Sequence, residues 1–289
     1  MSAIKTIKQV IPSQKVNMGG HILDQPLPAR GIEHADPFLL IHHWISVMPG
    51  NERQEDVGVG IHPHRGFSPV TFVYKGDVQH RDSLGNNAIV EEGGTQWMFA
   101  GKGITHSERP SKAMAEKGGD MEFTQFWVNA PAKNKMDEPF YKPISKEETP
   151  TITEGGTSIQ IVCGQYQGVK GNITYYSPLL LLRVTMSKSD STTLHVEKNH
   201  TTIIYLLDGG LTVNGNSIKG KDMILFHNDG TEIEVTATAN TRFIVLSGEP
   251  INEPIVSYGP FVMNTEQEIM QTLDDSKKGK LGILIEDFN

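Results

Sequence analysis

The chain has a single cysteine among its 289 residues, Cys163, and only 7% of its residues are aromatic. A disulfide within the chain is therefore excluded, and so is a zinc cluster of several thiolates. This scarcity of cysteine fits a reducing intracellular compartment. The 37% of hydrophobic residues is still enough to bury the core of one large domain or of two ordinary ones.

Long apolar runs are also missing. Runs such as Leu179–Leu182 are far shorter than the roughly 20 residues that cross a bilayer. The first 28 residues mix polar and apolar side chains and lack the apolar core, roughly 7–15 residues long, of a secretory signal. We therefore expect a soluble, cytoplasmic protein with no membrane partner.

The chain lacks an excess of positive charge. Its 26 lysine and arginine residues face 34 acidic residues, which gives a formal net charge of −8. A negative surface repels phosphate backbones and anionic lipids. Direct nucleic-acid binding is therefore not expected.

What the sequence does contain is a series of short β-branched and aromatic segments bounded by glycine or proline. Examples are residues 69–76, 201–215 and 241–250. This pattern is typical of an all-β sandwich or barrel. It lapses between Pro131 and Gly156, where proline, lysine and glutamate accumulate, so we expect two β domains, at 1–140 and 141–289.

The end of the chain is the segment that reads as a helix. Thr265 and Glu268 have the spacing of a capping box, and Ile269, Met270 and Leu273 follow them on one expected face. Gly279 comes after the expected end of the helix. We interpret this element as a surface helix that covers a β domain.

Two short motifs carry the chemistry. In the stretch Gly60–Phe67, read as a strand, His62 and His64 point to the same face because side chains alternate. His106 and Glu108 repeat this i, i+2 spacing about forty residues later. If the two strands face each other, three imidazoles and one carboxylate converge on a site with open positions. Such a donor set suits Fe(II), Mn, Ni or Zn, and we take Fe(II) as the first choice.

Several longer stretches resemble the pirin family of bicupins, and together they cover most of the chain. The stretches are "HPHRGF" (62–67), "HRDSLGN" (80–86), "QWMFAGKGITHSE" (96–108), "FWVNAP" (126–131) and "GEPINEPIVSYGPFVMNT" (248–265). The resemblance implies two tandem cupin-type β-barrels and a C-terminal helix, with a single metal ion in the N-terminal barrel and none in the C-terminal one. The family's metal ligands map onto His62, His64, His106 and Glu108.

The sequence departs from the family at one informative position. Many pirin-like sequences carry glutamate directly after "HPHRGF", whereas this chain has Ser68. One candidate base is therefore absent. Glu108 would then act both as a ligand and as the catalytic base.

The resemblance implies an Fe-dependent dioxygenase of the quercetin 2,3-dioxygenase type, which would use O2 and an aromatic small molecule such as a flavonol. The alternative is a regulatory protein without catalysis, whose metal oxidation state controls binding to a transcription-related protein partner. A third reading is a stress-linked cupin that has lost its catalysis. We expect a monomer in each case.

Other polar residues are interpreted as structural. His42 and His43 are adjacent, so on a strand they face opposite ways and cannot both bind one metal without a bend. His80 precedes a turn, and Arg65 points away from the face of His62 and His64, which suggests a surface ion pair. The second half holds His195, His200 and His227 in no comparable pair.

Overall fold

The computed structural model describes residues 3–288. These residues form two compact units, each built from segments that are distant in the sequence. The first unit combines residues 1–42 with 147–251, and the second combines 43–146 with 252–289. The predicted domains, 1–140 and 141–289, are continuous, whereas these units are not. The second unit includes the C-terminal helix.

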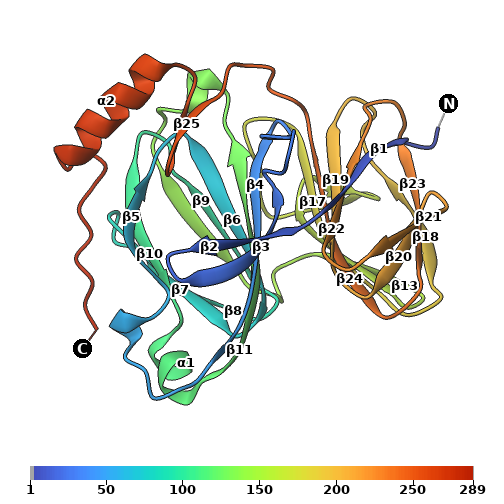
Figure 1. Cartoon of the computed structure of the whole chain (residues 1–289), viewed down its shortest axis with the longest axis horizontal. Helices are drawn as coiled ribbons and strands as arrows, with labels where there is room; N and C mark the ends of the chain where they lie inside the picture. Colours follow the sequence, from blue (N-terminus) through green and yellow to red (C-terminus); the bar gives the residue numbers. More distant parts are fainter. Residues whose placement is uncertain (1–2, 289) are drawn as a thin grey trace. The chain divides into compact units, whose positions relative to one another are not determined.

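The first unit holds a seven-stranded sheet in the order β1-β22-β19-β24-β17-β14-β13 and a four-stranded sheet in the order β18-β23-β20-β21 (Figure 1). The strands of the larger sheet are β1 (Ile7–Pro12), β13 (Thr151–Glu154), β14 (Thr157–Cys163), β17 (Leu179–Met186), β19 (Thr201–Asp208), β22 (Asp222–Phe226) and β24 (Thr241–Gly248). The smaller sheet contains β18 (Ser191–His195), β20 (Gly210–Val213), β21 (Asn216–Lys219) and β23 (Glu232–Ala237). The two-stranded sheet of β15 (Gln165–Tyr166) and β16 (Val169–Lys170) completes it. The strands β2 (Gln14–Met18) and β3 (His21–Leu27), also within residues 1–42, pair with each other.

The second unit has the same two-sheet plan. One sheet runs in the order β12-β9-β6-β11-β4-β3-β2, in which β3 and β2 come from residues 1–42, and the other runs in the order β5-β10-β7-β8. The first contains β4 (Phe38–Met48), which crosses the boundary between the units, β6 (Phe67–Lys75), β9 (Thr95–Phe99), β11 (Gly119–Asn129) and β12 (Phe140–Ile144). The second contains β5 (Val59–His64), β7 (Asp77–Asp82), β8 (Asn87–Glu91) and β10 (Ile104–Arg109). The hairpin β25 (Val256–Tyr258) and β26 (Phe261–Met263), the helices α1 (Lys112–Lys117) and α2 (Glu266–Lys277), and the 3-10 turns η1 (Gln54–Asp56) and η2 (Ala132–Asn134) complete it.

The expected fold class is confirmed: the chain is mostly β, with a helix at its C-terminal end. The two sheets within each unit are separate, so each unit is a β-sandwich and not the closed barrel that the resemblance implies. No helix in the part of the chain that the structure describes is long and apolar enough to cross a membrane.

The interiors of the two units differ in polarity. In the first unit the space between the sheets is filled by aliphatic and aromatic side chains, such as Leu182 and Phe243 from one sheet and Leu194 and Val213 from the other. In the second unit, buried polar side chains sit among smaller apolar clusters: His64, Thr71, His80, Gln96, His106 and Thr124. Buried polar groups cost free energy unless they find partners. The second unit therefore holds the candidate site.

The capping box predicts the C-terminal helix correctly. The Thr265 side chain accepts a hydrogen bond from the Glu268 backbone N–H, and the Glu268 side chain accepts one from the Thr265 N–H. One face of α2 packs through Ile269 against Phe261 and Met263 of β26. Met270, expected on the same face, is exposed.

The interpretation of Arg65 as a surface ion pair is wrong in one respect. Its guanidinium is buried and donates to the Asp275 carboxylate at 3.0 Å and to the Thr272 hydroxyl at 3.2 Å, both on α2. The ion pair exists, but the helix covers it. Sequence alone could not place α2 against the end of β5.

His42 supplies a test of how burial affects stability. Its Nε2 lies 2.9 Å from the side-chain oxygen of Gln25, and burial lowers the pKa of His42 from 6.5 to about 4. The unfolded chain keeps the ordinary pKa, so between these two values the unfolded state binds more protons than the folded state. The free energy of unfolding therefore falls as the pH drops from about 6.5 toward 4.

A His42→Gln variant is expected to lose less stability on acidification than the native protein. The difference between pH 7 and pH 4.5 should shrink by about 2–3 kcal/mol, the linkage free energy of one group shifted this far. Urea unfolding of both proteins at the two pH values measures it. An unchanged pH dependence would show that His42 titrates normally in the folded chain.

Candidate metal centre

Three imidazoles come together between the sheets of the second unit, as the two H-x-H and H-x-E motifs predict. His62 and His64 lie on β5, and His106 on β10 pairs directly opposite His62. One ring nitrogen from each of the three histidines lies within 4.8 Å of the other two. His64 and His106 are buried, while His62 is partly exposed. This group could hold a metal ion.

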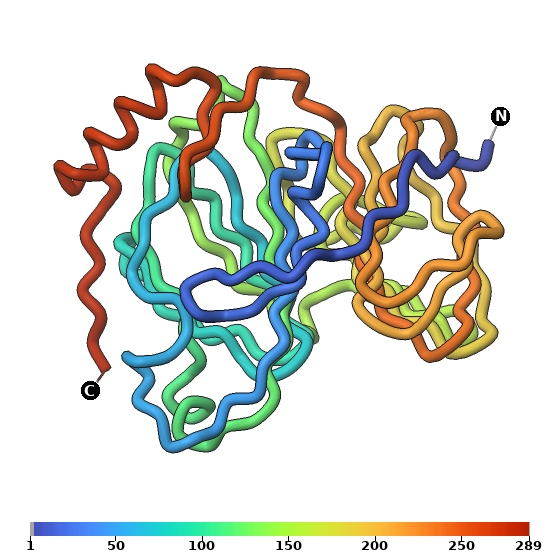
Figure 2. The backbone as a smooth tube through the Cα atoms, viewed as in Figure 1, coloured from blue at the N-terminus to red at the C-terminus, as the bar shows by residue number. Residues whose placement is uncertain are grey.

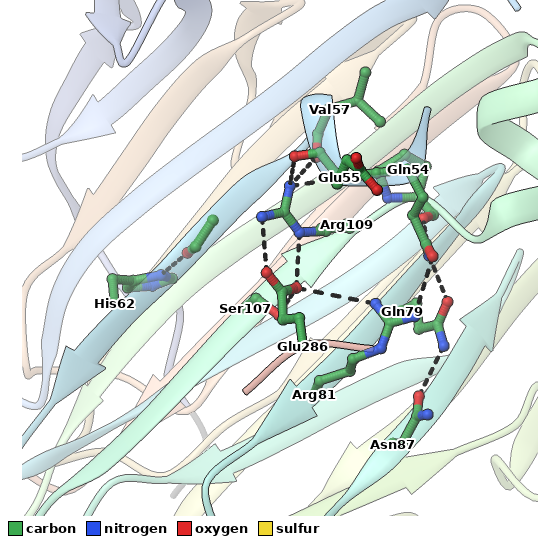
Figure 3. Close-up of polar contacts among 12 residues, drawn as sticks. Gln54, Glu55, Val57, His62, Gln79, Arg81, Asn87, Ser107, Arg109 and Glu286 are labelled. Atoms are coloured by element: carbon green, nitrogen blue, oxygen red, sulfur yellow. Dashed lines mark hydrogen bonds and ion pairs between the residues drawn. The ribbon is translucent and has the colours of Figure 1, made fainter. Parts of the chain in front are cut away.

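Hydrogen bonds at Nδ1 orient the rings of His62 and His64, which leaves the Nε2 of each ring available as a metal ligand. The His62 Nδ1–H donates to the Gly60 carbonyl at 2.8 Å (Figure 3). The His64 Nδ1–H donates to the Pro260 carbonyl at 3.1 Å. A histidine that donates from one ring nitrogen keeps a lone pair on the other, which is how metal-binding histidines are usually held.

The His106 Nε2 provides the clearest sign of a missing partner. It is buried and has no hydrogen-bond partner. A buried polar atom without a partner costs roughly 1–3 kcal/mol, so native structures rarely leave one. A metal ion bound by the three Nε2 atoms would satisfy it, and the residues present therefore fit a divalent metal.

The protonation of the site also suits a metal. Burial, and then the neighbouring His62, lower the pKa of both His64 and His106 well below the ordinary value of 6.5. Both rings are therefore neutral at pH 7. Metal binding requires the neutral imidazole, so no proton has to be displaced from these two ligands.

His106 contacts a pair of side chains formed by His80, which the sequence predicts to be structural, and Asp82. The Nδ1 atoms of His106 and His80 are 3.3 Å apart, and the His80 Nε2 lies 2.8 Å from the Asp82 carboxylate. If His80 donates from Nε2 to Asp82, its Nδ1 accepts the proton of His106 Nδ1. The His106 Nε2 is then left with its lone pair. The H-x-D spacing of His80 and Asp82 was the sequence signal for this pair.

The Asp82 carboxylate is well held. Oδ1 accepts the backbone N–H of Leu84 and of Asn86, and Oδ2 accepts the Asn86 side-chain amide at 2.8 Å. Burial alone would raise the pKa of Asp82, but the hydrogen bonds from His80 and Asn86 outweigh it and lower the pKa. Asp82 is therefore an anion that can polarise the imidazole of His80 and, through it, that of His106.

An Asp82→Asn variant is expected to bind metal 10–100-fold more weakly, because partners of metal-bound histidines typically have effects of roughly this size. The matched control is Asn86→Ala, which removes one donor to Asp82 but leaves the contact with His80, and should change the affinity far less. Competition with a fluorescent chelator measures both. Equal affinities for native protein and Asp82→Asn would refute this role.

Glu108, the expected fourth ligand and base, is held by two glutamine side chains. The side-chain amides of Gln96 on β9 and Gln125 on β11 donate to its carboxylate, with Gln125 at 2.9 Å from Oε2. The pairing of β10 with β5 shifts between His106 and Glu108 because the extra residue lies on β5, whereas β10 stays in regular register with β7 and keeps the alternation of its side chains. Its coordination of the metal stays a prediction.

The sequence does not predict a role for Gln96 and Gln125, because a neutral amide side chain does not by itself form a recognisable motif. Gln96 also accepts a hydrogen bond from the Tyr141 hydroxyl at 3.2 Å, and the Tyr141 ring stacks on His80 at 3.8 Å between centroids. Burial raises the pKa of Tyr141, and the Glu108 charge raises it further. The Tyr141 phenol is therefore a neutral donor that links both sides of the site.

Aromatic rings flank His64. Phe67 lies 5.2 Å and Trp127 5.6 Å from its ring centroid, and both meet it edge to face. The Trp127 Nε1 is buried and has no hydrogen-bond partner. Trp97 is instead ordinary core, since it is buried and its Nε1–H donates to the Ser68 hydroxyl at 3.1 Å. The Ser68 side chain thus contacts Trp97.

The sequence and structure comparisons agree with one another. Residues 21–128 match the family model described as Pirin, and residues 181–282 match the model described as Pirin C-terminal cupin domain. A Pseudomonas aeruginosa protein that is provisionally named quercetin 2,3-dioxygenase is 34% identical over 91% of this chain and 95% of its own. The pirin-like protein 2 of Arabidopsis thaliana is 32% identical over 96% of this chain and 85% of its own.

Solved structures extend this similarity. A quercetin 2,3-dioxygenase from Acinetobacter baumannii is 37% identical, with a TM-score of 0.92 over 98% of this chain and all of that one. A bacterial pirin from Escherichia coli, solved in complex with nickel(II), has 20% identity and a TM-score of 0.65 over 84% of this chain and 98% of its own. That second likeness concerns the fold alone.

Proposed function

Because the chain belongs to the pirin family, we propose that it is a metal-dependent dioxygenase that binds iron(II) through His62, His64 and His106 and acts on a flavonol. The observation that carries the proposal is the convergence of three imidazoles with an unpartnered, buried His106 Nε2. The similarity to a quercetin 2,3-dioxygenase at 37% identity supports the choice of substrate class.

Each side chain then has a defined task. The three histidines supply neutral nitrogen donors, and His80 with Asp82 keeps His106 in the required tautomer. A metal held by these nitrogens would supply Lewis acidity toward a flavonol hydroxyl and redox chemistry with O2. Glu108 accepts the proton of that hydroxyl.

Gln96 and Gln125 orient the Glu108 carboxylate, which accepts this proton. Gln125 donates to both carboxylate oxygens of Glu108, and Gln96 donates to Oε1. These bonds fix the carboxylate in one orientation, because an amide donor cannot rotate away without losing its acceptor. A general base has to be positioned before its basicity matters.

The aromatic side chains suit a flat substrate. Phe67 and Trp127 pack against each other with ring centroids 4.3 Å apart, and both contact His64. Phe67 is fully buried, so the partly exposed Trp127 ring is the one on which a planar flavonol gains free energy by stacking. The unpartnered Trp127 N–H can donate to a carbonyl or hydroxyl oxygen of the substrate.

Oxygen uptake tests the proposal. Protein loaded anaerobically with iron(II) is mixed with quercetin in aerated buffer, and an oxygen electrode follows consumption against metal-free and zinc-loaded controls. Stoichiometric consumption by the iron form alone supports the dioxygenase. If iron, manganese and nickel forms all leave O2 and a panel of flavonols untouched, the regulatory alternative takes its place.

A further inference from the structure

The strand that carries His106 and Glu108 has a second functional face. On β10, Thr105, Ser107 and Arg109 alternate with the two site residues, so their side chains emerge on the opposite side of the sheet. The Thr105 hydroxyl donates to the backbone carbonyls of Gly282 at 2.8 Å and Leu281 at 3.2 Å. The chain segment after α2 thus lies along the outer face of the ligand strand.

This C-terminal segment, residues 282–288, is extended but belongs to no sheet. Figure 2 shows it as the red trace that leaves the end of α2 and runs to the C-terminus. Its exposure alternates strictly: Ile283 is 75% and Ile285 86% exposed, whereas Leu284, Glu286 and Phe288 are partly buried. One row of side chains therefore faces the sheet and the other faces solvent.

Glu286 is the centre of the contact (Figure 3). Its carboxylate receives two bonds from Arg109, Nε to Oε1 at 2.8 Å and Nη2 to Oε2 at 2.9 Å. The Ser107 hydroxyl donates to Oε1 at 2.7 Å, and Arg81 Nη1 lies 4.0 Å away. Parallel bonds between a guanidinium and a carboxylate are the strongest ionic hydrogen bonds in proteins.

Two arginines share this one carboxylate. Arg81 and Arg109 are only 8% and 9% exposed, and the Glu286 side chain only 6%. Arg81 Nε and Nη1 have no hydrogen-bond partner. The ring of Phe288 lies below both guanidinium groups, at 5.1 Å from Arg81 and 5.4 Å from Arg109. Without the C-terminal segment, two neighbouring buried cations would lose this anion and aromatic face.

The start of the segment, at Gly282, is also closely packed against the rest of the second unit. Gly282 has a φ of +90°, and a Cβ at this position would lie 2.2 Å from the Ser83 hydroxyl oxygen. Arg109 also donates to the backbone carbonyls of Glu55 and Val57, both at 2.8 Å. The contacts therefore connect the C-terminal segment with β10 and with the turn before β5. These are the two strands that carry the three histidines.

We propose that the outer face of β10 is a binding site for an extended acidic and aromatic peptide, that the chain's own residues 283–288 occupy it, and that Glu286 is a positioning residue for the metal ligands on β10. The peptide-binding part of this proposal is independent of the proposed function. The effect of Glu286 on the metal ligands rests on the proposed function.

The first test separates the segment from its site. A chain that ends at Gly282 is mixed with a fluorescent peptide of sequence 283–289, and binding is followed by anisotropy. We expect saturable binding that is at least roughly tenfold weaker for the peptide with the Glu286→Gln substitution, because the charged bidentate contact is lost. A folded truncated chain that binds neither peptide would overturn the proposal.

The second test keeps the chain whole, in case the truncated one does not fold. In metal-free protein, Glu286→Gln should speed amide hydrogen exchange in β10, whereas the exposed Ile285→Ala control should not. In iron-loaded protein, Glu286→Gln should release metal to a chelator roughly 10-fold faster, the lower end of the effect of residues that position metal ligands, and the Ile285→Ala control should release it at the native rate. Unaltered exchange and unaltered release would contradict the positioning role. If the native protein takes up no metal, the proposed function fails while the peptide and exchange results still decide this inference.

Discussion

A His106→Ala variant is expected to lose the metal almost completely. A site of three or four ligands that binds a divalent ion with about 10–16 kcal/mol draws roughly 3 kcal/mol or more from each, which corresponds to a loss of affinity of about 100-fold or greater. His106 contributes more than its own bond, because its Nε2 is the buried atom that has no other partner. Elemental analysis after gel filtration measures the metal content.

The matched control is His200→Asn. His200 is also buried, and burial also lowers its pKa, but it lies in the first unit with its Nδ1 3.4 Å from the Ser247 hydroxyl. This variant should keep the native metal content. A His106→Ala protein that retains one tightly held metal per chain would show that the three histidines are not the site.

A Glu108→Gln variant is expected to lose about 10²–10⁴-fold in kcat, the range that a general base typically contributes. The amide cannot accept the hydroxyl proton, and its own NH2 would face the NH2 groups of Gln96 and Gln125, which now donate to the carboxylate. Glu91→Gln, on the exposed end of β8, is the control and should retain the native rate.

The metal content of Glu108→Gln adds a second result. If Glu108 is a ligand as well as the base, the variant should bind iron more weakly than the native protein. If it is only the base, affinity should change little while oxygen uptake with quercetin collapses. A kcat within twofold of the native value would exclude Glu108 from proton transfer.

The sequence predicts the parts of this site that depend on local spacing. His62 and His64 share a face because strand side chains alternate, and the capping box of Thr265 and Glu268 marks the start of α2. The pirin resemblance, which the comparisons confirm, supplied the pairing of these motifs across two strands.

The remaining features depend on contacts between distant residues. Glu286 reaches Arg109 across 177 positions, and Arg65 reaches Asp275 across 210. No periodic pattern encodes such pairs. The discontinuous units have the same origin, since β1 at residues 7–12 pairs with β22 at residues 222–226.

Anomalous diffraction from crystals of the iron-loaded protein, recorded at the iron absorption edge, tests the central claim most directly. The account predicts one strong peak per chain, roughly 2.0–2.3 Å from the Nε2 atoms of His62, His64 and His106. A map without a peak among these three rings, or with its peak elsewhere in the chain, would contradict it.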